Sequence, residues 1–265
     1  MNVIVLAAGI GNRLLPLTKS IPKFMIEFSK KSLFKRNLDI FRKCNIKNIT
    51  IVIGPNVNVI NYPNVKYVVK EKVLDTNMLD SLFYAENYLE SPIIISYGDI
   101  IFEKSVLTKL LESTADISIV VDTDWIKYFK HRIDDPLNDA HECVVIDNDD
   151  NITSIGLEVK NLDDVDGHFI GLMKVQNNGI KIFKDFYHKS KLEATEKFNP
   201  LHPNLTFTNS RLADLIQGLI LSGTLIKSIP IKNGWLEFDT MKDFEIYNHM
   251  LKNGTLPKII QLDDF

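Results

Sequence analysis

The chain has 265 residues, of which 45% are hydrophobic, so it is long enough to bury a substantial core. Its 31 basic and 34 acidic side chains are interspersed and give a formal net charge of −3, which argues against a basic face for nucleic acid or membrane. Small-molecule partners are therefore expected. The first apolar run ends at Ala8, far short of the roughly 20 residues that span a bilayer, and no basic leader precedes it. We therefore expect a cytoplasmic protein.

The first half of the chain alternates short apolar runs with segments of helical periodicity. The runs ITIVI and IIIS are apolar and mostly β-branched, which suits strands that are covered on both faces. Alternation of this kind predicts an α/β fold with a doubly wound, mostly parallel sheet. The expected strands are residues 2–7, 48–54, 65–70 and 92–100, and the expected helices are residues 32–44 and 76–89.

The second half departs from this alternation. Residues 142–146 and 152–159 predict two antiparallel strands around an acidic turn, and the periodicity of residues 211–223 predicts an amphipathic helix. Residues 191–209, rich in Pro and Asn, are expected to form a long loop. We expect one domain with a small mixed β extension over the carboxyl edge of the sheet. The other expected elements are helices at 106–113, 179–190 and 240–251, and strands at 116–122, 167–175, 224–231 and 234–239.

The segment LAAGIGNRLLPLTKSIPK follows the first expected strand and carries Gly9 and Gly11. Small residues let several backbone N–H groups approach one anionic oxygen. Neither G-x-G-x-x-G nor G-x-x-x-x-G-K-[ST] is present, because Leu14 stands where both patterns, counted from Gly9, require a glycine. Two prolines interrupt the segment, so Arg13 and Lys23 are expected on extended chain. A guanidinium and an ammonium on one irregular loop suit a triphosphate that is being cleaved.

The run LAAG-x-G-x-R-x-x-PLT-x-x-x-PK resembles the signature of nucleotidyltransferases that join a nucleoside triphosphate to a sugar 1-phosphate, phosphocholine or a phosphonate. Every signature position from Leu6 to Lys23 is matched. The resemblance implies a Rossmann-like fold of the nucleotide-diphospho-sugar transferase type. It also implies that Arg13 stabilises departing pyrophosphate and that Lys23 bridges the phosphates of nucleotide and acceptor. The nucleotide contacts implied in this loop are Leu6, Ala7, Ala8, Gly9, Gly11 and Asn12.

Transfer to an anionic acceptor calls for a divalent cation held by hard oxygen ligands, and Mg²⁺ is expected. Asp99 follows a buried strand directly, and Asp239 follows the short strand WLEF. Both match the similar family, which carries a G-D and a W-x-E-x-D-T-x-x-D segment. Asp239 also suits the N-cap of the next helix, and the two roles are compatible. The implied reaction is in-line attack by an acceptor oxygen on the α-phosphorus, with pyrophosphate leaving.

The choice of nucleotide and acceptor depends on two further resemblances. Members that use sugar 1-phosphates usually show G-T-A-x-A-[LI] where this chain has DTNMLDSL. The segment in this chain resembles that of cytidylyltransferases acting on phosphocholine, 2-aminoethylphosphonate or phosphoglutamine, which have an Asn at the position of Asn77. This resemblance implies that the nucleotide is CTP. The middle of the chain resembles the phosphonate and phosphoglutamine enzymes, which take part in cell-surface modification. The residues assigned on this basis to the acceptor pocket are Trp125, Arg132, Glu142, Lys160 and Glu237.

Each assignment has a chemical reason, and alternatives stay open. Arg132 or Lys160 can clamp an acid and Glu142 can meet an ammonium, whereas Trp125 suits either a cationic head group or the core. A UTP or dTTP transferase for sugar 1-phosphates is the alternative enzyme, and a nucleotide-binding regulatory module without turnover is the alternative of another class. The oligomeric state is open, a homodimer being common in such families. Within the single domain 1–265, we expect residues 1–122 to bind nucleotide, 123–232 the acceptor and 233–265 the metal.

Overall fold

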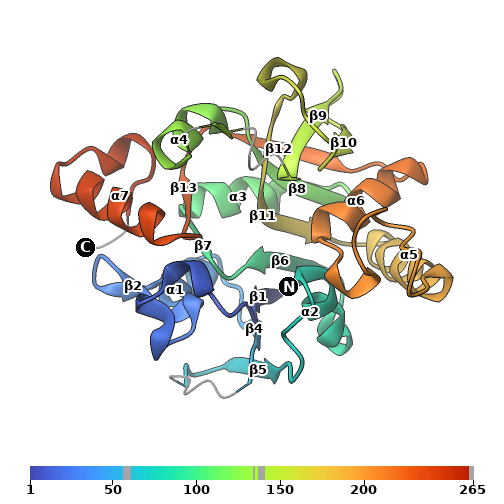
Figure 1. Cartoon of the computed structure of the whole chain (residues 1–265), viewed down its shortest axis with the longest axis horizontal. Coiled ribbons are helices and arrows are strands. Elements are labelled where there is room, and N and C mark those ends of the chain that lie inside the picture. The colour runs from blue at the N-terminus through green and yellow to red at the C-terminus, as the bar shows by residue number, and fades with distance from the viewer. Residues whose placement is uncertain (56–60, 134, 137–140, 263–265) are drawn as a thin grey trace.

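A computed structural model describes residues 1–55, 61–133, 135–136 and 141–262. Its main sheet has the order β10-β9-β11-β6-β1-β4-β5, and β8 lies beside β11 with β12 beside β8 (Figure 1). The strands are β1 (Asn2–Ala7), β2 (Glu27–Phe28), β3 (Lys31–Ser32), β4 (Asn48–Ile53), β5 (Val65–Val69), β6 (Ile93–Tyr97), β7 (Ile100–Phe102), β8 (Ile117–Asp122), β9 (Cys143–Ile146), β10 (Ile152–Ile155), β11 (Gly167–Val175), β12 (Lys227–Ile231) and β13 (Trp235–Glu237). The α-helices are α1 (Leu33–Lys43), α2 (Met78–Tyr84), α3 (Lys104–Glu112), α4 (Trp125–Arg132), α5 (Gly179–Glu193), α6 (Leu212–Leu221) and α7 (Met241–Lys252).

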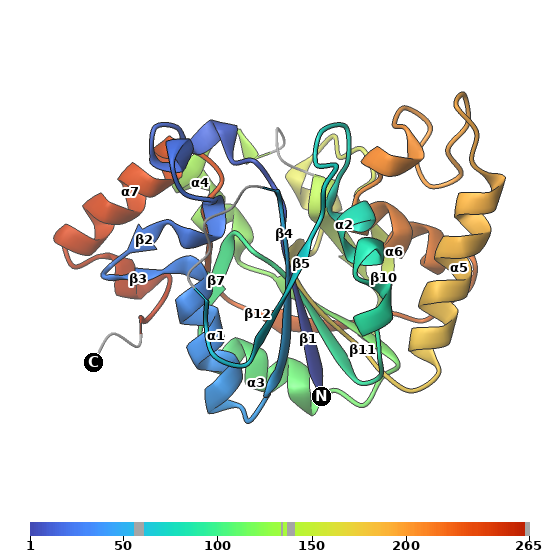
Figure 2. The ribbon, with the colours of Figure 1, turned by 90° about the horizontal axis from the view of Figure 1, so that it is seen from below.

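The centre of the sheet is parallel, and β1 lies between β4 and β6. Because both faces are covered, these strands are apolar along almost their whole length and nearly all their side chains are buried. Helices α1 and α3 lie on one side of the sheet, and α2, α5 and α6 lie on the other (Figure 2). The predicted α/β fold with a mostly parallel sheet is therefore confirmed. The described residues include no helix long and apolar enough to cross a bilayer.

The mixed part of the sheet is organised by β11, which runs antiparallel to β6, β8 and β9. Strand β12 pairs in parallel with β8 and meets Asn151 through a single antiparallel bridge at Lys227. Its outer edge accommodates Pro230, which lacks an amide proton. A separate two-stranded pairing joins β13 to β7 and places Glu237 opposite Ile100. The backbone N–H of Phe238 donates to Asp99 O at 2.9 Å, so the two acidic segments lie against each other.

Two local expectations differ from the structure. The segment after the first glycine loop forms three short 3₁₀ turns, Asn12–Leu14, Leu17–Lys19 and Lys23–Met25, instead of extended chain, because prolines suit the first position or the cap of such turns. Helix α4 is not among the elements that periodicity predicts. Its short apolar face, which includes Trp125, Tyr128 and Phe129, is fully buried.

Candidate active site

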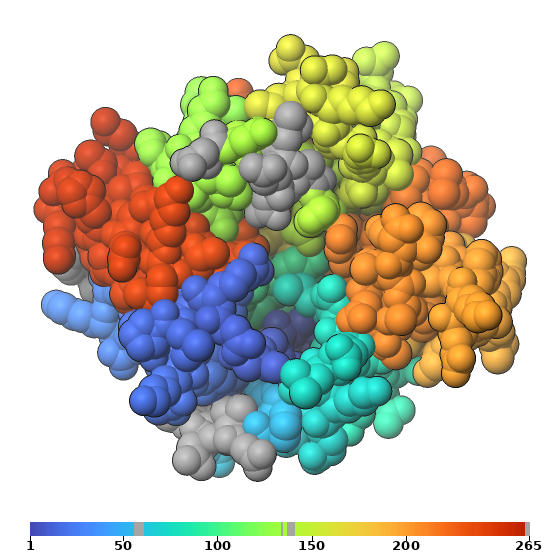
Figure 3. All heavy atoms as spheres, in the orientation of Figure 1, coloured from blue at the N-terminus to red at the C-terminus, as the bar shows by residue number. Residues whose placement is uncertain are grey.

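A pocket with a volume of about 450 Å³ opens at the carboxyl ends of β1 and β6, where ligand sites of parallel α/β sheets usually form. Figure 3 shows it as a hollow in one face, bordered by the N-terminal segment (blue), the α2 region (teal) and the loop before α6 (orange). Its walls come from segments far apart in the sequence. The loop from Leu6 to Arg13, the start of α2, and the ends of β6 and β13 all contribute.

The glycine loop is held in a conformation that an ordinary side chain would disturb. Gly11 has a φ of +73°, and a Cβ there would lie 3.0 Å from the methyl group of Thr18. The hydroxyl of Thr18 donates to Gly11 O at 2.8 Å and closes the loop. All six loop residues predicted to contact nucleotide line the pocket, and their roles stay predictions.

Gly98 lies between the end of β6 and Asp99, and it brings this segment against the glycine loop. Its N–H donates to Leu6 O at 2.8 Å. A Cβ at Gly98 would lie 2.7 Å from both Leu6 O and the Cβ of Ala7, closer than packed atoms approach. The absence of a side chain therefore lets β6 reach the loop and sets the position of Asp99, the next residue.

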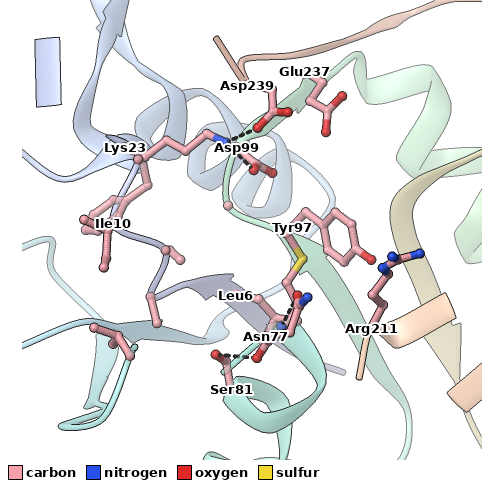
Figure 4. A pocket seen from close by; sticks show the side chains of 18 of the residues that line it. Leu6, Ile10, Lys23, Asn77, Ser81, Tyr97, Asp99, Arg211, Glu237 and Asp239 are labelled. Atoms are coloured by element: carbon pink, nitrogen blue, oxygen red, sulfur yellow. Dashed lines mark hydrogen bonds and ion pairs between the residues drawn. The ribbon is translucent and has the colours of Figure 1, made fainter. Parts of the chain in front are cut away.

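Four charged residues predicted from three motifs line the pocket: Arg13 and Lys23 from one, Asp99 and Asp239 from the other two. Figure 4 shows Lys23 close to Asp99 and Asp239. Lys23 Nζ lies 2.7 Å from Asp99 Oδ2 and 2.9 Å from Asp239 Oδ1. Arg13 Nη2 lies 2.7 Å from Asp239 Oδ2, but the Arg13 side chain is 70% exposed, so this pair is the more strongly screened. Ion pairs therefore link the segment that carries Arg13 and Lys23 to the two segments that carry Asp99 and Asp239.

The electrostatics of this cluster favour the charged forms of Lys23 and Asp239. Burial opposes the charge of Lys23, but Asp99 and Asp239 outweigh burial and raise the pKa of the ammonium above its usual range. Burial likewise acts to raise the pKa of Asp239, but Lys23 and then Arg13 lower it below the usual carboxyl range. At neutral pH the cluster therefore contains an ammonium and a carboxylate.

The acidic groups fit a divalent cation. Asp99, Glu237 and Asp239 can each present one carboxylate oxygen within 4.8 Å of the other two. Asp99 Oδ1 is buried and, among the described residues, has no hydrogen-bond partner. A hard cation would satisfy this oxygen, because carboxylate oxygens are the ligands that Mg²⁺ prefers. Glu237, predicted for the acceptor, therefore lies with the metal candidates.

The N-cap role that Asp239 also suited is filled by the next residue. Thr240 caps α7 by accepting from Asp243 N, and Asp243 accepts in return from Thr240 N at 2.7 Å. Thr240 and Asp243 form a capping box, which leaves the Asp239 carboxylate directed at Lys23 and Arg13.

Arg132 supports the acidic segment from beneath. It is only 3% exposed, and it pairs with Glu237 Oε2 at 2.8 Å and with Asp243 Oδ1 at 2.9 Å. Asp243 in turn accepts from the backbone N–H of Asp239. Among the described residues, Arg132 does not line the pocket, so the structure gives it a place behind the metal segment rather than against an acceptor.

Of the other residues predicted from the sequence, some line the pocket and some do not. Glu142 lines the pocket and accepts from the hydroxyl of Tyr97 at 2.6 Å. Trp125 is 1% exposed and packs against His168, with ring centroids 5.5 Å apart, and it is not part of the described pocket wall. Lys160 is exposed and is not part of that wall either. Asn77, predicted for the nucleotide, lines the pocket and caps α2 by accepting from Met78 N at 2.7 Å.

Sequence reasoning missed several residues of the pocket wall. Tyr97 precedes the G-D pair directly, and alternation along β6 was the available signal that its side chain shares a face with Ile95. Arg211 is the first residue of the helix predicted over residues 211–223 and follows a long predicted loop, where no pattern separates it from a solvated charge. The other unpredicted polar lining residues are Lys70, Thr76, Ser81, His141 and His168.

Comparison with known proteins identifies the family of this chain. Residues 3–165 match the family model of the MobA-like NTP transferase domain. The CTP:phosphoglutamine cytidylyltransferase of Campylobacter jejuni is 30% identical over 258 residues, which cover 93% of this chain and 98% of that protein.

Solved structures share the fold. The inositol-1-phosphate CTP transferase from T. maritima has a TM-score of 0.67 and 21% identity, covering 98% of this chain and 97% of the other. The CTP:phosphocholine cytidylyltransferase from Streptococcus pneumoniae has a TM-score of 0.68 and 15% identity, covering 94% and 98%. Fold and site together define a nucleotidyltransferase. The chain belongs to the MobA-like NTP transferase family.

Proposed function

We propose that this enzyme transfers CMP from CTP to a small acceptor that carries a phosphate or phosphonate, and that it releases pyrophosphate. The observation that carries the proposal is the junction of Lys23 with Asp99 and Asp239 at the mouth of the glycine loop. A fixed ammonium beside a three-carboxylate cluster suits phosphates that are brought together and cleaved, since phosphoryl-type transfer depends mainly on positioning and charge neutralisation.

In the proposed step, an anionic oxygen of the acceptor attacks the α-phosphorus in line. A new bond forms between that oxygen and the α-phosphorus, and the bond from the α-phosphorus to the oxygen bridging to the β-phosphate breaks. Pyrophosphate leaves with the electron pair. Because the attacking oxygen is already anionic at neutral pH, the step needs no general base.

Each charged residue has a separate task in this proposal. Lys23 neutralises the acceptor and α-phosphate oxygens, and the exposed Arg13 neutralises the departing pyrophosphate. Asp99, Glu237 and Asp239 would hold Mg²⁺, which supplies further charge neutralisation when bound. Arg132 keeps this acidic segment in place through Glu237 and Asp243.

CTP is proposed on two grounds. The Campylobacter relative, which aligns over most of the chain, is named as a CTP enzyme. Asn77 uses its side-chain oxygen on Met78 N, and among the described residues its amide nitrogen has no hydrogen-bond partner. That nitrogen can donate to the O2 carbonyl of a pyrimidine base, which cytosine and uracil share, so Asn77 suits CTP while the choice against UTP is supported by the relative.

Pyrophosphate release tests the proposal. CTP, UTP, dTTP, ATP and GTP are each supplied with Mg²⁺ and with phosphoglutamine, 2-aminoethylphosphonate, phosphocholine or a sugar 1-phosphate. We expect release with CTP and a phosphorylated or phosphonate acceptor, and none in EDTA. Preferential turnover of UTP or dTTP with a sugar 1-phosphate would overturn the proposal in favour of the alternative enzyme.

A further inference from the structure

Arg211 is a cation of the pocket wall that the proposed chemistry does not use. Its side chain enters the pocket on the opposite side from Lys23 (Figure 4). Arg13 and Lys23 pair with carboxylates of the metal cluster, and Lys70 Nζ lies 2.8 Å from a carboxylate oxygen of Asp80. Within the described part of the chain, no hydrogen bond or ion pair satisfies the guanidinium of Arg211. Asp214 and Arg211 attract each other electrostatically without a hydrogen bond between their side chains, so an anionic ligand group would be the first direct partner of the guanidinium.

The backbone at Arg211 is held in place by two local contacts. Its N–H donates to Asp214 Oδ2 at 2.6 Å, across the first turn of α6. The preceding Ser210 is buried, and its hydroxyl accepts from Asn199 Nδ2 at 2.8 Å. These contacts fix the end of a long loop, so the side chain of Arg211 starts from a fixed backbone position at the pocket wall.

An acid occupies the same pocket. Glu142 accepts from Tyr97, whose pKa is raised well above its usual range by burial and by the neighbouring Glu142, so the tyrosine remains a donor. The Tyr97 ring is accommodated because Gly171 has no side chain: a Cβ there would lie 2.2 Å from the ring. Gly171 adopts a φ of +79° at an irregularity in β11. The wall thus presents an oriented carboxylate as well as a guanidinium.

We propose that Arg211 binds a carboxylate and Glu142 an ammonium of the acceptor, and that the acceptor is a phosphorylated amino acid or amino acid amide. This inference rests on the proposed transfer to a phosphorylated acceptor. The acceptor phosphate faces Lys23, and the zwitterionic end faces Arg211 and Glu142. Phosphocholine and 2-aminoethylphosphonate carry a cationic group but no carboxylate, so either would leave Arg211 without a partner.

Matched acceptors test the inference. Pyrophosphate release from CTP is measured with phosphoglutamine, with its analogue lacking the α-carboxylate and with its analogue lacking the α-amino group, besides phosphocholine and 2-aminoethylphosphonate. We expect removal of either group to lower kcat/KM about 10- to 100-fold, as for a lost charge-assisted hydrogen bond. Equal or better turnover of phosphocholine would overturn the inference.

The variant Arg211→Gln assigns the carboxylate preference to one side chain. We expect it to lose most discrimination between phosphoglutamine and the decarboxylated analogue, mainly through KM, while the KM for CTP changes little. Arg211→Lys should restore part of the preference. Arg42→Gln, on the exposed surface of α1, is the control. Undiminished discrimination by Arg211→Gln contradicts the inference.

The two proposals fail differently in this assay. If CTP supports turnover only with acceptors that lack a carboxylate, the proposed binding of an amino acid group by Arg211 and Glu142 is wrong. The proposed transfer of CMP is then still supported. If CTP supports no turnover with any phosphorylated or phosphonate acceptor, the proposed function itself fails.

Discussion

The ammonium of Lys23 lies 2.7 Å from a carboxylate oxygen of Asp99, although 76 residues separate them in the sequence. Lys23 belongs to the loop region that follows β1, and Asp99 follows β6, the parallel neighbour of β1. The pair therefore links the nucleotide loop to the candidate metal site. Since the same ammonium also contacts Asp239, it acts as the counter-ion of two carboxylates.

Replacing Lys23 by Met should have opposite effects on turnover and on the response to metal. We expect kcat/KM to fall at least about 100-fold, because a preorganised charge facing the phosphates is lost. In the nucleotide-free protein, Mg²⁺ or Mn²⁺ should raise Tm more in the variant than in wild type, because two carboxylates lack their cation. Thermal unfolding with and without metal checks this, with Lys19→Met, exposed in the same segment, as the control. An unchanged metal response would contradict the counter-ion role.

The variants Asp99→Asn and Asp239→Asn should each lower turnover about 100-fold or more and weaken Mn²⁺ binding, since each loses an anionic ligand. Calorimetric titration with Mn²⁺, together with pyrophosphate release, measures both effects. Asp163→Asn, in the turn Leu162–Asp164 away from the pocket, is the matched control. Wild-type Mn²⁺ affinity in both variants would exclude these aspartates as ligands.

Gly98→Ala should damage both stability and turnover. The added methyl group would lie 2.7 Å from Ala7 Cβ and from a backbone oxygen, so the loop or β6 must shift and carry Asp99 with it. Overpacking of this kind costs about 1–3 kcal/mol of unfolding free energy. Gly54→Ala is the control, because its Cβ meets nothing nearer than 3.4 Å. Urea denaturation measures the unfolding free energy of both variants. Equal values would contradict the expected overpacking at Gly98.

The lowered pKa of Asp239 predicts a pH-dependent contribution to the stability of the metal-free protein. A carboxyl whose folded pKa is depressed stabilises the fold above its unfolded pKa of about 4, and that stabilisation is lost as pH falls through the folded value. The unfolding free energy of wild type minus that of Asp239→Asn should therefore be steady near neutral pH and shrink below about pH 4. The raised pKa of Lys23 keeps the ammonium charged over this range. Denaturation in EDTA at several pH values measures the difference, and a gap that widens in acid would refute the assigned ion pairs.

The fold was largely predictable because its strands carry a strong local signal. Buried parallel strands such as β1 and β4 are continuous apolar runs, so their pattern identifies both the element and its environment. Helix α4 was missed because its eight residues give too few turns for periodicity to register. Asp239 remained a possible cap of α7 because aspartate and threonine both suit an N-cap, and only the reciprocal bond with Asp243 distinguishes them.

The candidate site was predictable only in part. Motif matches selected Arg13, Lys23, Asp99 and Asp239, and the structure brings these four together, whereas their catalytic roles stay predictions. The acceptor assignments rested on a looser resemblance that carried no information on side-chain direction. Arg132 and Trp125 accordingly lie buried behind the described wall.

The sequence by itself determined the order of elements and the chemical groups available, because apolar periodicity and short motifs are local properties. Only the tertiary structure decided which groups share a pocket. The close approach at Gly98 joins loop to strand, and the pairing of β13 with β7 brings Asp239 beside Asp99. Arg211 illustrates the limit: a lone arginine has no periodicity to detect, and its place opposite Lys23 arises from long-range packing that no short stretch of sequence encodes.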